Sequence, residues 1–410
     1  MLAKRLLRRV SLSVICLGVC SIVAAAKAPP AKTPATVGDS NFHLRGAFDN
    51  SRIQFTRGKT GHVAFIGGSI TEMNGYRPMV CSMLTKRFGD TKFTFTDAGI
   101  SSTCSTTGAG RLASDVLSKG PADLFFIEFA VNDDQDAGHK LRECIRGMEG
   151  IIRHGRTCNP NMDIVITYFV NPGMIKTIDA GKNPIPMTGH KKVAEYYSIS
   201  TIDLAREVAG QIKAKTLTWK KFGGVHPGPY GNAMCTKMIE KLLDKAWAKP
   251  PASGAKKTAH KMPAKPIDDH SYFDARFIAP AKAKVKSGWK LGVPDWKSLK
   301  GGKRGRFTKV EMISADDTGA ELTLEFTGKG IGAYVIAGPD AGVLEAIVDG
   351  GKPVTVDLYH RYSRGLHYPR TVMFDADLKA GKHILKLKTV AIENRKQGGP
   401  AARILQFVAN

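Results

Sequence analysis

Four short segments of the sequence contain side chains suited to acyl transfer. The first is Phe65–Thr71, in which an apolar stretch ends in Gly67-Gly68 and is followed by Ser69. The two glycines allow a tight turn and the close approach of a substrate to the backbone. A serine at such a turn is a candidate nucleophile, although the same pattern also occurs in plain connections between elements.

The other three segments supply candidate partners for this serine. They are the stretch 97–103, Asn132 in Ala130–Asp133, and His226 in Val225–Pro227. A serine nucleophile, a histidine base and an asparagine that donates to an oxyanion are the components of an acyl-transfer site. Asn132 alone would be explained equally well as a helix N-cap, and His226 as a histidine of a surface loop.

Alternating apolar strands and amphipathic helices are expected to position these residues. The expected strands are 62–66, 92–96, 123–129 and 163–169, and the expected helices are 78–87, 110–117, 140–154, 191–197 and 232–247. This alternation predicts βαβ units and a parallel sheet with helices on both faces. Since such sheets bind ligands at the carboxyl ends of their strands, the segments are expected to meet at one edge.

The order of the four segments resembles the SGNH (GDSL-like) hydrolase superfamily over about residues 60–247. The resemblance implies a flavodoxin-like three-layer α/β/α domain with esterase activity and with no metal or organic cofactor. It also implies that Ser69 is the nucleophile and that His226 is the general base and later the acid. The oxyanion hole would be formed by the backbone N–H groups of Ser69 and Ser102 and by the side-chain amide of Asn132.

The sequence departs from the family pattern at two positions. Ser102 occupies the position of a family glycine, and Gly223 occupies the position of an aspartate that normally orients the histidine. Three alternatives follow: a Ser–His dyad with a backbone carbonyl holding the imidazole, a substitute carboxylate, or a lapsed site. Loss of the aspartate from a serine protease adapted to it costs about 10⁴ in rate. Gly223→Asp would restore the family spacing.

The aspartates after Asn132 could suggest a calcium site. Asp133, Asp134 and Asp136 lack the spaced oxygen ligands and the glycine of a calcium loop. We therefore expect them to form an acidic first turn that interacts with a helix dipole.

Composition divides the chain into several parts. We predict a signal peptide, a linker, the hydrolase domain, a second linker rich in Lys, Pro and Ala, and a β-sandwich, at 1–26, 27–45, 46–248, 249–268 and 269–410. The sandwich is predicted from short alternating segments such as 321–326 and 384–388. Its aromatic and basic clusters, 359–362 and 367–370, are suited to stacking on sugar rings, to packing between the domains or to covering the sandwich edge.

The N-terminus predicts export. Four basic residues precede an apolar run over 11–26 that ends in Ala24-Ala25-Ala26. Such a run is typical of a signal peptide and is short for a membrane anchor, so we expect a secreted or periplasmic protein without stable membrane insertion. An uncleaved anchor is the alternative.

The chain is strongly basic. Its formal net charge is +25, and removal of residues 1–26 would leave +21. This charge favours acidic partners, although it could equally reflect a generally basic surface. Export and the lack of any nucleic-acid-binding motif argue against nucleic acid, so the expected partner is an acylated polysaccharide, neutral or anionic.

Five cysteines remain after the predicted cleavage, and an odd number leaves at least one thiol without an intramolecular partner. Cys144 and Cys158 are the best candidates for a disulfide because they bracket a short helical segment. No Cys-x-x-Cys pattern occurs, which gives a structural zinc site no support.

Together these features predict a secreted serine esterase that removes O-acyl groups, with O-acetyl the favoured one, from a polysaccharide through an acyl-enzyme. A lipase or thioesterase is the alternative with the same chemistry, but no long apolar lid separates the motifs. A carbohydrate-binding protein with a lapsed active site is the alternative suggested by Gly223.

Overall fold

The structure is a computed structural model that describes residues 36–46, 48–391 and 393–410. The predicted signal peptide and most of the first predicted linker lie outside these residues. Within the described ranges, no helix is both long and apolar enough to cross a membrane.

A six-stranded sheet forms the centre of the first domain, in the order β1-β6-β5-β4-β2-β3. Its strands are β1 (Phe42–His43), β2 (Thr60–Gly67), β3 (Lys92–Gly99), β4 (Leu124–Glu128), β5 (Asp163–Thr167) and β6 (Ser200–Ile202). Strands β2 to β6 are parallel, and the short β1 pairs antiparallel with β6. The five parallel strands have the flavodoxin-like order, which confirms the predicted fold class. The chain changes direction across the sheet between β2 and β4, and such a switch point is where these folds bind ligands.

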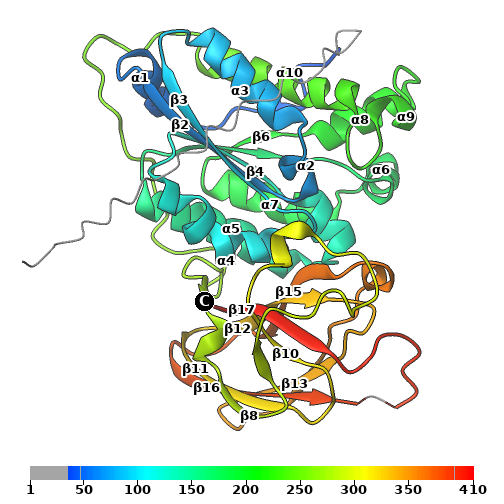
Figure 1. Ribbon diagram of the computed structural model, residues 1–410. Coiled ribbons are helices and arrows are strands. Elements are labelled where there is room, and N and C mark those ends of the chain that lie inside the picture. The colour runs from blue at the N-terminus through cyan, green and yellow to red at the C-terminus, as the bar shows by residue number, and fades with distance from the viewer. Residues whose placement is uncertain (1–35, 47, 392) are drawn as a thin grey trace, which may run out of the picture.

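Helices cover both faces of this sheet (Figure 1). One face carries α3 (Tyr76–Arg87), α8 (Leu204–Lys213) and α10 (Pro229–Ala246), and the other carries α4 (Ser105–Asp115), α5 (Leu141–Cys158) and α7 (Ile185–Tyr196). The short helices are α1 (Asp49–Thr56), α2 (Ser69–Glu72), α6 (Pro172–Asp179) and α9 (Trp219–Phe222). In α5, the side chains of Met148, Ile151 and Ile152 share one buried face, which explains why this segment packs as an amphipathic helix.

The second domain consists of two antiparallel sheets, which confirms the predicted sandwich. One sheet has the order β15-β12-β17-β10-β9, with β7 paired to β17, and the other has the order β14-β13-β16-β11-β8. The strands are β7 (Arg276–Ile278), β8 (Lys284–Ser287), β9 (Lys290–Gly292), β10 (Met312–Ala315), β11 (Glu321–Gly328), β12 (Ile331–Ala337), β13 (Val343–Val348), β14 (Val354–Asp357), β15 (Tyr368–Asp375), β16 (Gly381–Val390) and β17 (Ala402–Ala409). Along β11, Leu322, Leu324 and Phe326 point into the core and alternate with polar side chains, as expected for a strand with one solvated face.

The sandwich packs against the α4 and α5 side of the first domain (Figure 1). Gly110 of α4 allows this close approach, because a Cβ atom there would lie 3.0 Å from the Phe277 ring. At α5, the buried Arg146 binds Asp268 at 3.1 Å and Asp377 of the second domain. Apolar packing and a shared buried cation therefore fix the two domains together.

The predicted linker 249–268 lies along the surface of the first domain. The backbone N–H of Thr258 donates to the Asn50 side chain at 2.8 Å, and the His260 ring contacts Asp163 at 2.8 Å. Arg57 also donates to the Ala255 carbonyl at 2.6 Å. These contacts attach the segment to the domain that precedes it.

The predicted disulfide between Cys144 and Cys158 is wrong. All five cysteines of the described residues are free thiols. Cys144 and Cys158 lie near the two ends of the single helix α5, so their Cα atoms are about 21 Å apart along its axis. A disulfide requires a Cα separation of about 4.4–6.8 Å.

The contact between α5 and the Tyr272 segment predicts a stability difference between two helical glycines. A Cβ atom at Gly150 would lie 2.6 Å from the Tyr272 backbone, whereas Gly210 of α8 is exposed with open space around it. We expect Gly150→Ala to destabilise the protein by about 1–3 kcal/mol through overpacking. Gly210→Ala is the matched control and should stabilise it by about 0.4–1 kcal/mol. Calorimetric melting of both variants measures this, and equal shifts in Tm would contradict the packing argument.

Candidate active site

Ser69 lies at the carboxyl edge of the sheet. Strand β2 ends at Gly67, and Ser69 is the first residue of the short helix α2. A Cβ atom at Gly68 would lie 2.0 Å from Oδ1 of Asn132. The glycine is therefore required for Asn132, which follows β4, to approach the turn that carries Ser69.

The structure brings His226 to the Ser69 hydroxyl, with 2.7 Å between Nε2 and Oγ. His226 lies in the loop between α9 and α10, and neighbouring backbone groups hold this loop. The Asn232 side-chain amide donates to the Pro227 carbonyl at 2.6 Å, and the Gly228 N–H donates to the Phe222 carbonyl at 2.9 Å. The loop therefore positions the imidazole without a contact from an acidic side chain.

The other ring nitrogen of His226 has neither of the partners that the sequence suggested. Among the described residues, no carboxylate lies within 4.0 Å of the ring, and no backbone carbonyl accepts a hydrogen bond from it. The expectation that a backbone carbonyl holds the imidazole is therefore not met. Partial burial of the ring, followed by the positive charge of Arg304, lowers the pKa of His226.

The three expected oxyanion donors lie on neighbouring segments at the sheet edge, with Asn132 Oδ1 nearer than Nδ2 to the position of a Cβ atom at Gly68. The Ser69 N–H is free of an intrahelical partner because Ser69 begins its helix. Ser102 has a φ of 70°, the left-handed region that favours the glycine usual at this family position. Asn132 is buried, and its Nδ2 donates to Asp136 Oδ2 at 2.5 Å. Asn132 begins a turn of π-helix, Asn132–Asp136, and the hydrogen bond to Asp136 at the end of this turn orients its amide.

Asp133 differs from the expectation of a solvated first turn. Its side chain is completely buried and accepts hydrogen bonds from the Ser105 N–H at 2.8 Å, from Ser105 Oγ at 2.7 Å and from His190 at 2.9 Å. Burial alone would raise the pKa of Asp133, but His139 and His190 outweigh it and hold the pKa well below its usual range. The dipole explanation is wrong for Asp133. Its buried carboxylate interacts with groups from three neighbouring elements and not with a helix dipole.

The second domain contributes two cations to the site that sequence reasoning missed. Arg304 donates to the Ser101 carbonyl and to Ser102 Oγ, each at 2.8 Å. Arg306 binds Glu72 of α2 at 2.8 Å, and Glu72 in turn accepts from the Ser101 N–H at 2.7 Å. These contacts connect the loop of Ser102 to the helix of Ser69. No sequence signal identifies either arginine, since both are far from the motifs along the chain.

One group in the described part of the chain has the residue types of a metal site: Cys104, Asp133 and His139. Both carboxylate oxygens of Asp133 already accept hydrogen bonds, and His139 lies 3.4 Å from one of them. The carboxylate of Asp133 is thus already engaged by Ser105 and His190, although the three ligand atoms lie within 4.8 Å of one another.

Known proteins with similar sequence or structure support this description. Residues 65–234 match the GDSL-like Lipase/Acylhydrolase family. A two-domain esterase active on acetylated mannans, co-crystallised with mannopentaose, matches with a TM-score of 0.67 and 20% identity over 89% of this chain and 96% of that chain. A second structure of a two-domain esterase active on acetylated mannans matches with a TM-score of 0.64 and 21% identity over 89% of this chain and 97% of that chain. No curated protein matches the sequence.

The fold, the family match and the arrangement of both domains define the class. The first domain belongs to the GDSL-like (SGNH) hydrolases, and the protein is a carboxylic ester hydrolase. The similarity at 20–21% identity extends over both domains, so the β-sandwich is part of a shared two-domain architecture.

The geometry at Gly223 predicts that restoring the family aspartate will fail. Gly223 has a φ of 108°, and a Cβ atom there would lie 1.8 Å from the Gly228 nitrogen. We expect Gly223→Asp to displace the loop that carries His226 and to lower kcat/KM on a small acetyl ester by at least about tenfold, since misplacement by 1 Å costs about 10². Gly224→Ala is the control, because it shares the positive φ but has open space around it. Higher activity of Gly223→Asp would contradict this account.

The proximity of Arg304 predicts a change in the ionisation of His226. Removing the positive charge should raise the pKa of His226, because the imidazolium would no longer face a cation. Titration of the imidazole Cε1–H resonance by NMR compares Arg304→Gln with Arg304→Lys, which retains the charge. A pKa that is unchanged in Arg304→Gln, or raised equally in both variants, would contradict an electrostatic effect.

Proposed function

We propose that this protein is an exported serine esterase that removes O-acetyl groups from a polysaccharide through an acyl-enzyme. The observation that carries the proposal is the 2.7 Å contact between Ser69 Oγ and His226 Nε2 at the switch point of the sheet. The described similarity to a two-domain esterase active on acetylated mannans supports a polysaccharide substrate.

In the proposed mechanism, His226 Nε2 removes the proton from Ser69 Oγ as the oxygen attacks the acetyl carbonyl. The negative charge on the carbonyl oxygen is stabilised by the N–H groups of Ser69 and Ser102 and by Nδ2 of Asn132. The imidazolium then protonates the departing sugar hydroxyl. Water activated by the same imidazole hydrolyses the acyl-enzyme and regenerates Ser69.

The electrostatics of the site are suited to this use of His226. A general base must be neutral, and the lowered pKa of His226 favours its neutral form. Activity should therefore be retained on acidification until the pH falls through a pKa that lies below the ordinary value of about 6.5.

The positive charge of the protein is consistent with an anionic polysaccharide. The formal net charge is +25, and Arg304 and Arg306 lie beside the loop of Ser102. A carboxylate on the sugar chain would interact favourably with this surface. The N-terminal pattern supports export to the periplasm or the medium.

The nucleophile assignment predicts the effect of Ser69→Ala. We expect acetate release from acetylated mannan and from a simple acetyl ester to fall by at least about 1,000-fold, since removal of a catalytic serine costs more than this in known serine hydrolases. The Tm should change little. Ser82→Ala, at an exposed serine of α3, is the matched control and should retain full activity.

Further measurements distinguish the alternatives. Residual activity above a tenth in Ser69→Ala would remove this serine from the mechanism. Greater turnover of long-chain esters than of acetylated polysaccharide would favour a lipase. Binding of mannan by the unmodified protein with no acetate release from any acetylated substrate would favour a lapsed site. Comparison of acetylated mannan with an acetylated uronic-acid polymer tests the anionic preference.

A further inference from the structure

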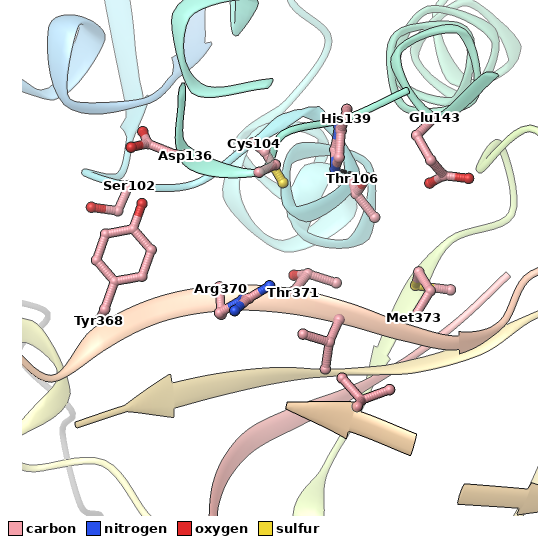
Figure 2. Close-up of a pocket in the computed structure, with 13 residues that line it drawn as sticks. Ser102, Cys104, Thr106, Asp136, His139, Glu143, Tyr368, Arg370, Thr371 and Met373 are labelled. Carbon is pink, nitrogen blue, oxygen red and sulfur yellow. Dashed lines mark hydrogen bonds between the residues drawn. The ribbon is translucent and has the colours of Figure 1, made fainter. Parts of the chain in front are cut away.

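A pocket of about 280 Å³ lies between the two domains, with Ser102 at its edge (Figure 2). The first domain lines it with Cys104 and His139, and strand β15 of the second domain lines it with Tyr368 and Arg370. Neither the proposed esterase mechanism nor the packing of the domains uses these four side chains together.

Cys104 is the nucleophilic group of this pocket. It immediately precedes helix α4, and its side chain is buried except where it faces the pocket. The sulfur lies within 4.8 Å of a nitrogen of His139 and of an oxygen of Asp133. The positive end of the helix and a neighbouring imidazole are the two features that stabilise thiolates in proteins.

His139 lies between the Cys104 thiol and the buried Asp133. Its Nδ1 lies 3.4 Å from Asp133 Oδ1, and Asp133 is itself fixed by Ser105 and His190. Burial would lower the pKa of His139, but the thiol and the carboxylate outweigh it and raise the pKa well above its ordinary value. Burial would likewise raise the pKa of Cys104, but the facing His139 lowers it.

The opposite wall offers a cation without a carboxylate partner within the described ranges. Arg370 makes one long hydrogen bond, 3.4 Å to the Leu358 carbonyl, and no carboxylate of the described residues lies within 4.0 Å of it. The Tyr368 hydroxyl is buried and faces Ser102 and Asp136 at one end of the pocket. Figure 2 shows Arg370 and Cys104 facing the same cavity. A small molecule with a carboxylate would satisfy the guanidinium and place its reactive atom near the sulfur.

We propose that Cys104 is a reactive thiolate and that this pocket binds a small disulfide bearing a carboxylate, which becomes attached to Cys104. The Cys104 sulfur attacks one sulfur of the disulfide, a new S–S bond forms and the original S–S bond breaks. The released thiolate takes a proton from water. Cys104 is thereby oxidised to a mixed disulfide, and half of the incoming disulfide is reduced to a thiol.

The other cysteines provide internal comparisons. Burial raises the pKa of Cys81 to about 12 and also raises the pKa values of Cys144 and Cys235. Cys158 is exposed at the end of α5. Faster labelling of Cys104 than of Cys158 would therefore reflect activation of the thiol and not its exposure to solvent.

The first experiment measures activation of the thiol in the full chain at about pH 6, where an ordinary thiol is less than about 1% ionised. Iodoacetamide is added and each cysteine is quantified by peptide mass spectrometry. Cys104 should react at least about tenfold faster than Cys158, and His139→Gln should reduce the Cys104 rate by at least about tenfold. The charged or titratable groups facing this sulfur are His139, Asp133, Arg370 and Tyr368, with Asp136 and Glu143 elsewhere in the pocket.

The second experiment tests the class of ligand. Dithiodipropionate, which is anionic, should modify Cys104 faster than cystamine, which is cationic. Arg370→Met should remove this preference when each rate is divided by the iodoacetamide rate of the same variant. Cys104→Ser should lose the modification and retain esterase activity, so this result is independent of the proposed function.

Three results would overturn the proposal. The first is equal or slower labelling of Cys104 relative to Cys158 in the folded protein. The second is a labelling rate unaffected by His139→Gln, with circular dichroism showing that the variant is folded. The third is stoichiometric zinc binding that blocks Cys104, which would identify the cluster as a metal site.

Discussion

The buried carboxylate of Asp133 is the interaction on which the functional edge of the sheet depends. A charge with no exposed surface is stable in a protein only when hydrogen bonds and opposite charges surround it. Here the start of α4, the histidine of α7 and the segment before α5 all direct donors at one side chain. The residue before it in the chain, Asn132, is thereby fixed against Gly68 and beside Ser69. The contacts that stabilise the charge of Asp133 therefore also fix the position of the Asn132 amide, which is proposed to bind the oxyanion.

The second domain completes this arrangement. Arg304 and Arg306 reach across the domain boundary and hold the loop of Ser102 against the helix of Ser69. Ser102 has a backbone conformation that costs energy for any residue other than glycine, and such conformations persist when the surroundings hold them. The sandwich therefore supports the geometry of the site directly, in addition to any role it has in binding substrate.

The sequence was sufficient to predict the residues that meet and the fold that brings them together, because both follow from local patterns. The apolar runs at β2 and β4 identify buried strands. Ser69 and Asn132 follow these strands, His226 precedes a helix, and the three residues occur in the order that is usual in the family. Arg304 could not be predicted, because its contact with Ser102 joins residues about 200 positions apart in two domains. The cysteine pairing failed for a different, local reason: the helix expected over 140–154 continues to Cys158, so the two thiols lie near opposite ends of α5.

The absence of an acidic partner for His226 changes how the proposed mechanism distributes charge. An orienting aspartate normally fixes the ring and stabilises the imidazolium. Here the loop held by Asn232 fixes the ring, and Arg304 disfavours the imidazolium. The same guanidinium lies beside the Ser102 loop, where negative charge develops on the carbonyl oxygen, and there its effect is favourable. Compared with a site that has an orienting aspartate, the proposed mechanism has less stabilisation of the protonated His226 and more stabilisation of the oxyanion.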